Sequence, residues 1–99
     1  MKSSFSQIIN DDKPVLVDFS ADWCGPCKTL GPILKDAKAE LGDEVKIVKI
    51  DVDKNQALAE KFQVRGVPTL ILFKNGKQLW RQSGVVQKSA IVQLIRSHQ

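Results

Sequence analysis

The apolar residues of the segment Val15–Phe19 do not alternate with polar ones, since Asp18 alone interrupts them. A strand with one face in water alternates with a period of two, so this run predicts a strand buried on both faces. The residues before it, 10–14, have the composition of a turn. The chain is therefore expected to fold around a sheet with this strand at its centre.

Four helices are predicted from apolar residues spaced by three and four positions. Ser4 is placed to cap the first helix, and Gly42 to end the second, which Pro32 should kink. The apolar positions are Phe5, Ile8 and Ile9 in the first helix; Leu30, Ile33, Leu34, Ala37 and Leu41 in the second, over 24–41; Leu58 and Phe62 in the third; and Ile91, Leu94 and Ile95 in the fourth.

Three more strands are predicted at 45–50, 67–73 and 78–81. The dipeptide Asn75-Gly76 between the last two is a strong signal for a two-residue hairpin turn. The element order is helix, strand, helix, strand, helix, strand, strand, helix, with parallel crossovers first and a hairpin last. This order predicts an α/β fold with a mixed sheet. A hydrophobic content of 42% is enough for one core, so residues 1–99 are expected to form a single domain.

The charged residues exclude some classes of partner. Fifteen basic and eleven acidic residues give a net charge of +4, but the basic residues are spread along the chain, so no nucleic-acid partner is expected. No stretch is long and apolar enough to span a membrane, and the N-terminal residues 1–6 have no apolar run like that of an export signal. We therefore expect a cytoplasmic protein.

Cys24 and Cys27 are the only cysteines, and they form a C-x-x-C motif between the buried strand and the long helix. Free N–H groups and the positive end of the helix dipole stabilise a thiolate there, which favours Cys24 as the nucleophile. Cys27 lies one turn further along and is expected to be less open to solvent. It can resolve a mixed disulfide by attacking Cys24, which leaves a Cys24–Cys27 disulfide.

Two other interpretations of the pair are open. A zinc site normally needs four Cys or His ligands, and the only further candidate is His98, so no metal is expected. A structural disulfide is the second, but closing so short a loop stabilises a fold by only about 2 kcal/mol. A cytosolic protein gains little from it.

Several motifs together resemble those of a known family. The segment 17–28, which contains Trp23-Cys24-Gly25-Pro26-Cys27, resembles the active-site strand and helix start of thioredoxins. Pro32, Lys49, Asp51-Val52-Asp53, Arg65-Gly66-Val67-Pro68-Thr69, Phe73-Lys74-Asn75-Gly76 and Gly84 continue the likeness in the family's order. By this resemblance the chain is identified as a member of the thioredoxin family over about residues 5 to 98.

The resemblance implies a surface that binds substrates. It implies a cis bond between Val67 and Pro68, with Pro68 against the two sulfurs and the Val67 backbone paired with an extended substrate. The residues alone favour an ordinary proline that opens a strand, and the resemblance reverses that preference. It also implies a flat apolar rim around Cys24, formed by Trp23, Gly66, Val67 and Gly84, although Trp23 alone can be core. Pro26, with Gly25, raises the reducing power of the pair in the family. Trp80 is left as core or sheet surface.

Asp18 is expected to take part in the chemistry. A carboxylate inside an apolar strand is costly to bury, so its pKa should rise. The alternative is an Asp at an exposed strand end. The resemblance implies that Asp18 lies beneath Cys27 and exchanges a proton with it, and Lys49 on the neighbouring strand is a candidate partner for Asp18.

The sequence departs from the family at two places. Family members usually carry another strand before the first helix, so we expect a sheet of four strands flanked by four helices. The edge at 45–50 is then unpaired and protected only by Lys46, Lys49 and Asp51, and dimerisation through this edge is a hypothesis. Ser20 stands where thioredoxins often carry an aromatic residue, which affects packing and redox poise.

The resemblance implies a thiol-disulfide oxidoreductase that reduces disulfides of client proteins and is re-reduced by an NADPH-dependent thioredoxin reductase. No glycine-rich dinucleotide motif is present, and no cofactor is expected. The expected oligomeric state is a monomer. Two other functions are open: a binding or chaperone module that uses the rim without turnover, and an oxidase or isomerase with the same fold.

Overall fold

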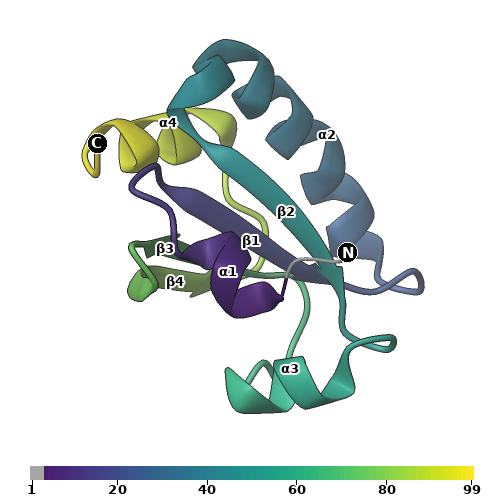
Figure 1. The fold of residues 1–99 in the computed structure, drawn as a ribbon. Coiled ribbons are helices and arrows are strands. Elements are labelled where there is room, and N and C mark those ends of the chain that lie inside the picture. The colour runs from purple at the N-terminus through teal and green to yellow at the C-terminus, as the bar shows by residue number, and fades with distance from the viewer. Residues whose placement is uncertain (1–3) are drawn as a thin grey trace.

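The computed structural model describes residues 4–99 and contains a sheet between two layers of helices (Figure 1). Residues 1–3 lie outside the described part. The expectation of no export signal rests partly on them. The elements are α1 (Phe5–Ile9), β1 (Val15–Ser20), α2 (Gly25–Leu41), a short 3-10 helix η1 (Gly42–Glu44), β2 (Lys46–Asp51), α3 (Gln56–Lys61), β3 (Thr69–Lys74), β4 (Lys77–Ser83) and α4 (Lys88–Arg96). In the described chain no helix is long and apolar enough to cross a membrane.

The four strands lie in the order β2-β1-β3-β4. Strand β1 pairs in parallel with β2 and antiparallel with β3, which in turn forms an antiparallel hairpin with β4. The prediction of a mixed four-stranded sheet flanked by four helices is confirmed. All six residues of β1 are buried, as the continuous apolar run predicts.

The prediction that both early crossovers are parallel is wrong for the second one. Helix α2 has 17 residues and is about 26 Å long, enough to return along a six-residue strand of about 20 Å. Helix α3 has six residues and is about 9 Å long. The chain therefore stays at the carboxyl end of β1, where Thr69 pairs with Phe19, and β3 runs back antiparallel.

Helix α2 begins and ends where the sequence indicates. Cys24 is its N-cap, and the C-cap Gly42 has a φ of 54°, a conformation that favours glycine. The Lys38 ammonium group donates to the carbonyl oxygens of Gly42 (2.8 Å) and Val45 (2.6 Å), which extends the cap. Pro32 lies inside the helix, and the kink expected there remains a prediction.

Each face of the sheet has its own apolar cluster. Helices α2 and α4 pack on the face that carries Leu16, Leu70 and Leu72. Helices α1 and α3 cover the other face, where four phenylalanine rings meet. These rings belong to Phe5, Phe19, Phe62 and Phe73. Trp80 is half-buried and packs against the α2/α4 cluster.

The hairpin between β3 and β4 forms as predicted. Asn75 and Gly76 have φ values of 52° and 79°, and a type I′ turn needs positive φ at both positions. Their N–H groups donate to the carbonyl oxygens of Asp11 (2.7 Å) and Ile9 (3.0 Å), which attach the turn to the end of α1. Strand β3 begins at Thr69, two residues later than predicted, because Pro68 has no N–H for the ladder.

Strand β2 lies at one edge of the sheet, as expected. Lys46 and Lys49 are exposed along it. The carbonyl oxygen of Val45, just before the strand, accepts from Lys38, and that of Asp51 at its end accepts from the Asn55 amide (2.9 Å). Side chains thus satisfy backbone groups at both ends of this edge.

Candidate active site

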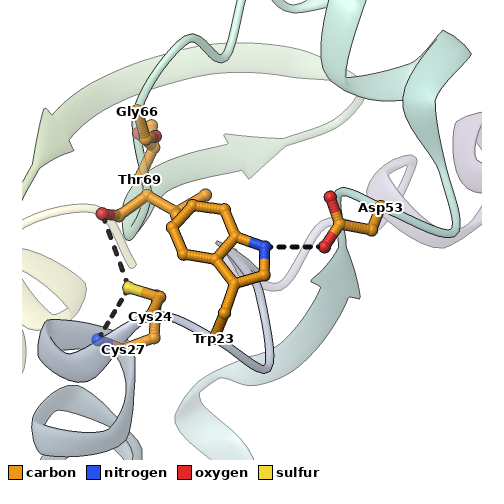
Figure 2. Close-up of a disulfide and its surroundings, with 7 residues drawn as sticks. Trp23, Cys24, Cys27, Asp53, Gly66 and Thr69 are labelled. Atoms are coloured by element: carbon orange, nitrogen blue, oxygen red, sulfur yellow. Dashed lines mark hydrogen bonds between the residues drawn. A yellow bond between two sulfur atoms is a disulfide. The ribbon is translucent and has the colours of Figure 1, made fainter.

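Cys24 and Cys27 lie at the junction of β1 and α2 and form a disulfide with their Cα atoms 5.3 Å apart. The backbone N–H of Cys27 donates to the Cys24 sulfur at 3.1 Å, so this sulfur acts as the side-chain cap of α2 (Figure 2). A sulfur in this position receives the positive end of the helix dipole and one N–H hydrogen bond. Both interactions favour a negatively charged Cys24 sulfur once the disulfide is reduced.

Solvent exposure does not separate the two cysteines in the way the sequence suggests. We expect Cys27 to be less open, but it is 7% exposed and Cys24 is 3% exposed. These values describe whole residues, so the lower exposure expected of the Cys27 sulfur stays a prediction. Cys24 is covered from the other side of the junction. Its sulfur lies 3.6 Å from the carbonyl oxygen of Val67.

The loop before β3 supplies that cover. The Val67–Pro68 peptide bond is cis, as the resemblance implies, and Pro68 is buried. The N–H of Gly84 donates to the Pro68 carbonyl oxygen at 2.9 Å, which joins the loop to the end of β4. Gly84 has a φ of 92°, which disfavours any residue with a side chain. Cys24, Val67, Pro68 and Gly84 are therefore brought together from three parts of the chain.

Thr69 fixes the other side of this loop. Its buried hydroxyl group donates to the Gly66 carbonyl oxygen at 2.7 Å and lies 3.0 Å from the Ser83 hydroxyl. Gly66 is exposed, while Val67 and Gly84 are half-buried. Gly25 and Pro26 are also exposed, in the first turn of α2.

Trp23 lies on the surface, so the interpretation of Trp23 as core is wrong. It is 70% exposed, yet its indole N–H donates to the Asp53 carboxylate at 2.8 Å. Figure 2 shows the ring beside Cys24 with its nitrogen turned toward Asp53. A large apolar ring is thus held in one orientation next to the redox pair, which suits it to contact a partner.

Asp18 is buried in the middle of the sheet, so the alternative of an exposed strand end is wrong. It is 3% exposed, and its Oδ1 atom has no hydrogen-bond partner in the described chain. Burial raises the pKa of Asp18 from 3.8 to about 6, and the positive charge of Lys49 opposes this rise. Lys49 lies directly across from Asp18 in the parallel register of β1 and β2.

A hollow of about 200 Å³ beside the redox pair extends from Cys27 to Lys49. Its lining includes Cys27 and Lys49 and is completed by Ala21, Asp22 and Lys28. Ser20, the residue that departs from the family pattern, is also buried at 1% exposure, and its hydroxyl oxygen has no partner in the described chain.

The zinc alternative has no ligand set in the described residues. Among residues 4–99, no group of three or more His, Cys, Asp or Glu side chains is placed to hold a metal ion. The His98 Nδ1 atom lies 2.9 Å from the Leu94 carbonyl oxygen at the end of α4.

Two residues of the site have roles that sequence reasoning missed. Asp53 orients Trp23 from 30 positions away, and Thr69 holds the Gly66 carbonyl and contacts Ser83. No local pattern predicts either contact. The one available signal is that both residues belong to segments that carry the resemblance.

Comparisons with known proteins agree with this geometry. The thioredoxin family model matches residues 1–97. The chain is 45% identical to thioredoxin of Haemophilus influenzae over 93 residues, which cover 94% of this chain and 87% of that protein. It is 44% identical to thioredoxin Y, chloroplastic, of rice over 96 residues, or 96% of this chain but only 57% of the rice protein's length.

A solved thioredoxin structure has a similar fold. A mutant thioredoxin from Halobacterium salinarum NRC-1 superimposes with a TM-score of 0.86 at 41% identity, over 99% of this chain and 85% of that one. Disulfide exchange is the chemistry that Cys24 and Cys27 can perform in this setting. The chain belongs to the thioredoxin family and, with its Cys24–Cys27 redox pair, is a thiol-disulfide oxidoreductase.

Proposed function

We propose that Cys24 is the attacking residue of a protein-disulfide reductase and Cys27 the resolving one. The observation that carries this order is the hydrogen bond from the Cys27 N–H to the Cys24 sulfur at the start of α2. It stabilises a thiolate on Cys24. No equivalent N-cap hydrogen bond reaches the Cys27 sulfur within the part of the chain that the structure describes.

Two exchanges complete the reaction. The Cys24 thiolate attacks one sulfur of a client disulfide, forms a mixed disulfide, and releases the other client sulfur as a thiolate. The Cys27 thiolate then attacks the Cys24 sulfur and releases the second client thiolate. Two electrons pass to the client, which takes up two protons, and the Cys24–Cys27 disulfide forms.

Asp18 is proposed to accept the proton of Cys27 before the second exchange. A carboxyl group with a pKa near 6 is largely ionised at neutral pH and is a stronger base than an ordinary carboxylate. Lys49 faces Asp18 across the two strands, and its positive charge opposes the rise in the pKa of Asp18, which favours the ionised carboxylate. Lys49 also lines the hollow that contains Cys27, which supports its assignment to the site.

Clients are proposed to bind around Cys24 on a rim formed by Trp23, Gly66, Val67, Pro68 and Gly84, with Gly25 and Pro26 at the helix start. The Val67 backbone next to the Cys24 sulfur supports pairing with an extended client segment. Backbone pairing places few demands on side chains, so a broad range of clients follows. By family resemblance, Pro26 raises the reducing power of the pair.

The family implies disulfide-containing substrates and a reductase partner. We propose an NADPH-dependent thioredoxin reductase as that partner, with electron transport and cellular redox homeostasis as the biological role. The cytoplasm is the proposed location, because a protein-disulfide reductase needs a reducing compartment. The rice relative is named chloroplastic, so a plastid is the alternative compartment.

The redox potential against glutathione tests the proposed direction. A protein that reduces disulfides should have a potential near that of thioredoxin, roughly −270 mV, whereas a strong oxidant lies near −120 mV. The fraction of Cys24–Cys27 disulfide is measured by thiol alkylation in glutathione buffers of graded ratio. A value at the oxidising end would replace the reductase with the oxidase or isomerase alternative.

We propose a single domain and a monomer in solution, even though β2 has a free edge within residues 4–99. Two copies joined along β2 would bring the exposed Lys46 and Lys49 of each chain close together, and like charges on paired strands are unfavourable. Sedimentation at rising protein concentration should give one species of 11.0 kDa. A shift toward twice that mass, abolished by Val48→Pro, would instead show dimerisation through this edge.

A further inference from the structure

The turn that follows α3 places glutamine where glycine is usual. Gln63 has a φ of 52°, a conformation that glycine adopts far more readily than a residue with a side chain. Its N–H donates to the Glu60 carbonyl oxygen at 2.9 Å, and the N–H of Val64 donates to the Ala59 carbonyl oxygen at 2.8 Å. These two hydrogen bonds form the Schellman arrangement that ends many helices, normally with glycine at the left-handed position. With glutamine there, the turn is less stable by itself.

Arg81 of β4 supports this turn. Its guanidinium group donates to the carbonyl oxygens of Phe62 and Gln63, with Nη2 at 2.8 Å from the Gln63 oxygen. Arg81 pairs with Ile71 across the β3–β4 ladder, so its side chain lies on the sheet face that α1 and α3 cover. Within residues 4–99 no carboxylate forms an ion pair with Arg81. Both terminal nitrogens of the side chain therefore bind the backbone of one turn.

The supported turn begins the segment that covers the redox pair. Four residues after Gln63, the carbonyl oxygen of Val67 lies 3.6 Å from the Cys24 sulfur. The far end of the segment is also attached to β4, since the Gly84 N–H at the end of that strand donates to the Pro68 carbonyl oxygen at 2.9 Å. The end residues of β4 thus hold the segment on both sides of Val67, and movement at either attachment changes where the Val67 backbone lies.

We propose that Arg81 is a positioning residue for client binding, because it fixes the turn from which the Val67 backbone reaches its place beside Cys24. The inference rests on the proposed function, in which an extended client segment pairs with that backbone. Arg81 acts on backbone groups of the turn and not on the sulfurs, so its loss should weaken client binding and leave the disulfide chemistry intact. A small aromatic disulfide has no peptide backbone to pair, so its reduction should not depend on Arg81.

Steady-state reduction of two substrates by Arg81→Gln tests this proposal. With insulin as the protein client, KM should rise about five- to tenfold at a nearly constant kcat, because binding must then order the segment at the cost of about one hydrogen bond. With an aromatic disulfide that releases a coloured thiol, kcat/KM should change by less than about twofold. Amide hydrogen exchange followed by NMR should become at least about fivefold faster at Val64 and stay unchanged at Val17 in β1.

Three further variants separate the position of the turn from the charge of the strand. Arg81→Lys keeps the positive charge and can donate to one of the two carbonyl groups, so KM for insulin should recover in part. Lys77→Gln removes one positive charge from an exposed position of the same strand and should leave KM unchanged. Adding Gln63→Gly to Arg81→Gln should slow exchange at Val64 again, because glycine favours the turn without Arg81.

Unchanged exchange at Val64 in Arg81→Gln would overturn the role of Arg81, and so would an equal rise in KM in Lys77→Gln. A parallel loss of activity on both substrates would also overturn it, because that result would show general damage to the site. Failure of the unmodified protein to reduce insulin would instead contradict the proposed function, while the exchange rates test the support of the turn independently of any client.

Discussion

Replacing Cys27 with serine is expected to stop turnover at the mixed disulfide, with disulfide reduction falling at least roughly a thousandfold. Cys24 retains its place at the N-cap of α2, where the helix dipole still favours its thiolate. The first exchange therefore proceeds, but a serine hydroxyl group cannot displace the client sulfur. Mass spectrometry after mixing with a disulfide peptide should show one covalent adduct per chain, and excess reductant should release it.

The matched variant Cys24→Ser should lose activity to the same extent but form little adduct. Its remaining thiol, Cys27, lacks the N-cap hydrogen bond that stabilises a thiolate on Cys24. Circular dichroism should show that both variants keep the fold. Adduct formation by Cys24→Ser and not by Cys27→Ser would reverse the proposed order of attack.

The double variant Cys24→Ser, Cys27→Ser separates a reductase from a binding module. It keeps the exposed Trp23 and the cis-Pro68 loop but has no sulfur. We expect all activity to be lost with both cysteines. If a client or partner kept its full functional response to this variant, the binding or chaperone alternative would be correct.

Much of the architecture could be predicted from the sequence because it depends on local patterns. The apolar run Val15–Phe19 requires burial on both faces, and the structure buries the whole of β1. The N-cap at Cys24, the stop at Gly42 and the turn at Asn75-Gly76 depend on backbone preferences of a few adjacent residues. The direction of β3 was predicted wrongly, because it depends on the length of α3, whose end at Lys61 the pattern of Leu58 and Phe62 does not define.

The candidate site was predictable only in part. The position of Asp18 follows from its apolar neighbours, and that of Cys24 from the start of a helix. The contact between Trp23 and Asp53 joins residues that are distant in the chain, and the cover of Cys24 by Val67 depends on how β3 enters the sheet. Those contacts arise from tertiary packing, so the periodicity of one sequence contains no signal for them.

Asp18→Asn is expected to stabilise the oxidised protein at neutral pH. Burial raises the pKa of the Asp18 carboxyl group from 3.8 to about 6, so the folded state binds the proton more tightly than the unfolded state does. Below the unfolded pKa the carboxyl group is neutral in both states and costs nothing. Between about pH 4 and 6 the carboxyl group ionises in the unfolded state but stays protonated in the folded state, so stability falls with rising pH. The loss is complete once the folded group also ionises above about pH 6, and it amounts to roughly 3 kcal/mol in total.

Asparagine remains neutral at every pH, so most of this loss should disappear. Near pH 7 to 8 the variant should unfold with a free energy higher by about 1–3 kcal/mol and a Tm higher by roughly 10 °C, while near pH 4 the two proteins should be similar. Thermal unfolding of the disulfide form across this pH range measures the effect, with Asp36→Asn on the exposed side of α2 as the matched control.

The same substitution should slow resolution by Cys27, since the thiol loses its base. An ordinary thiol with a pKa near 8.5 is only about 3% ionised at pH 7, so the second exchange should slow by about 10- to 30-fold at most. Above about pH 9 the thiol ionises unaided, and the rates should converge. Stopped-flow mixing of the reduced protein with an aromatic disulfide measures this rate, because resolution by Cys27 releases the second coloured thiol. A lower Tm together with an unchanged rate of this second release at pH 7 would show that Asp18 neither costs stability nor takes the proton of Cys27. A higher Tm with an unchanged rate of the second release would limit Asp18 to the electrostatics of the fold.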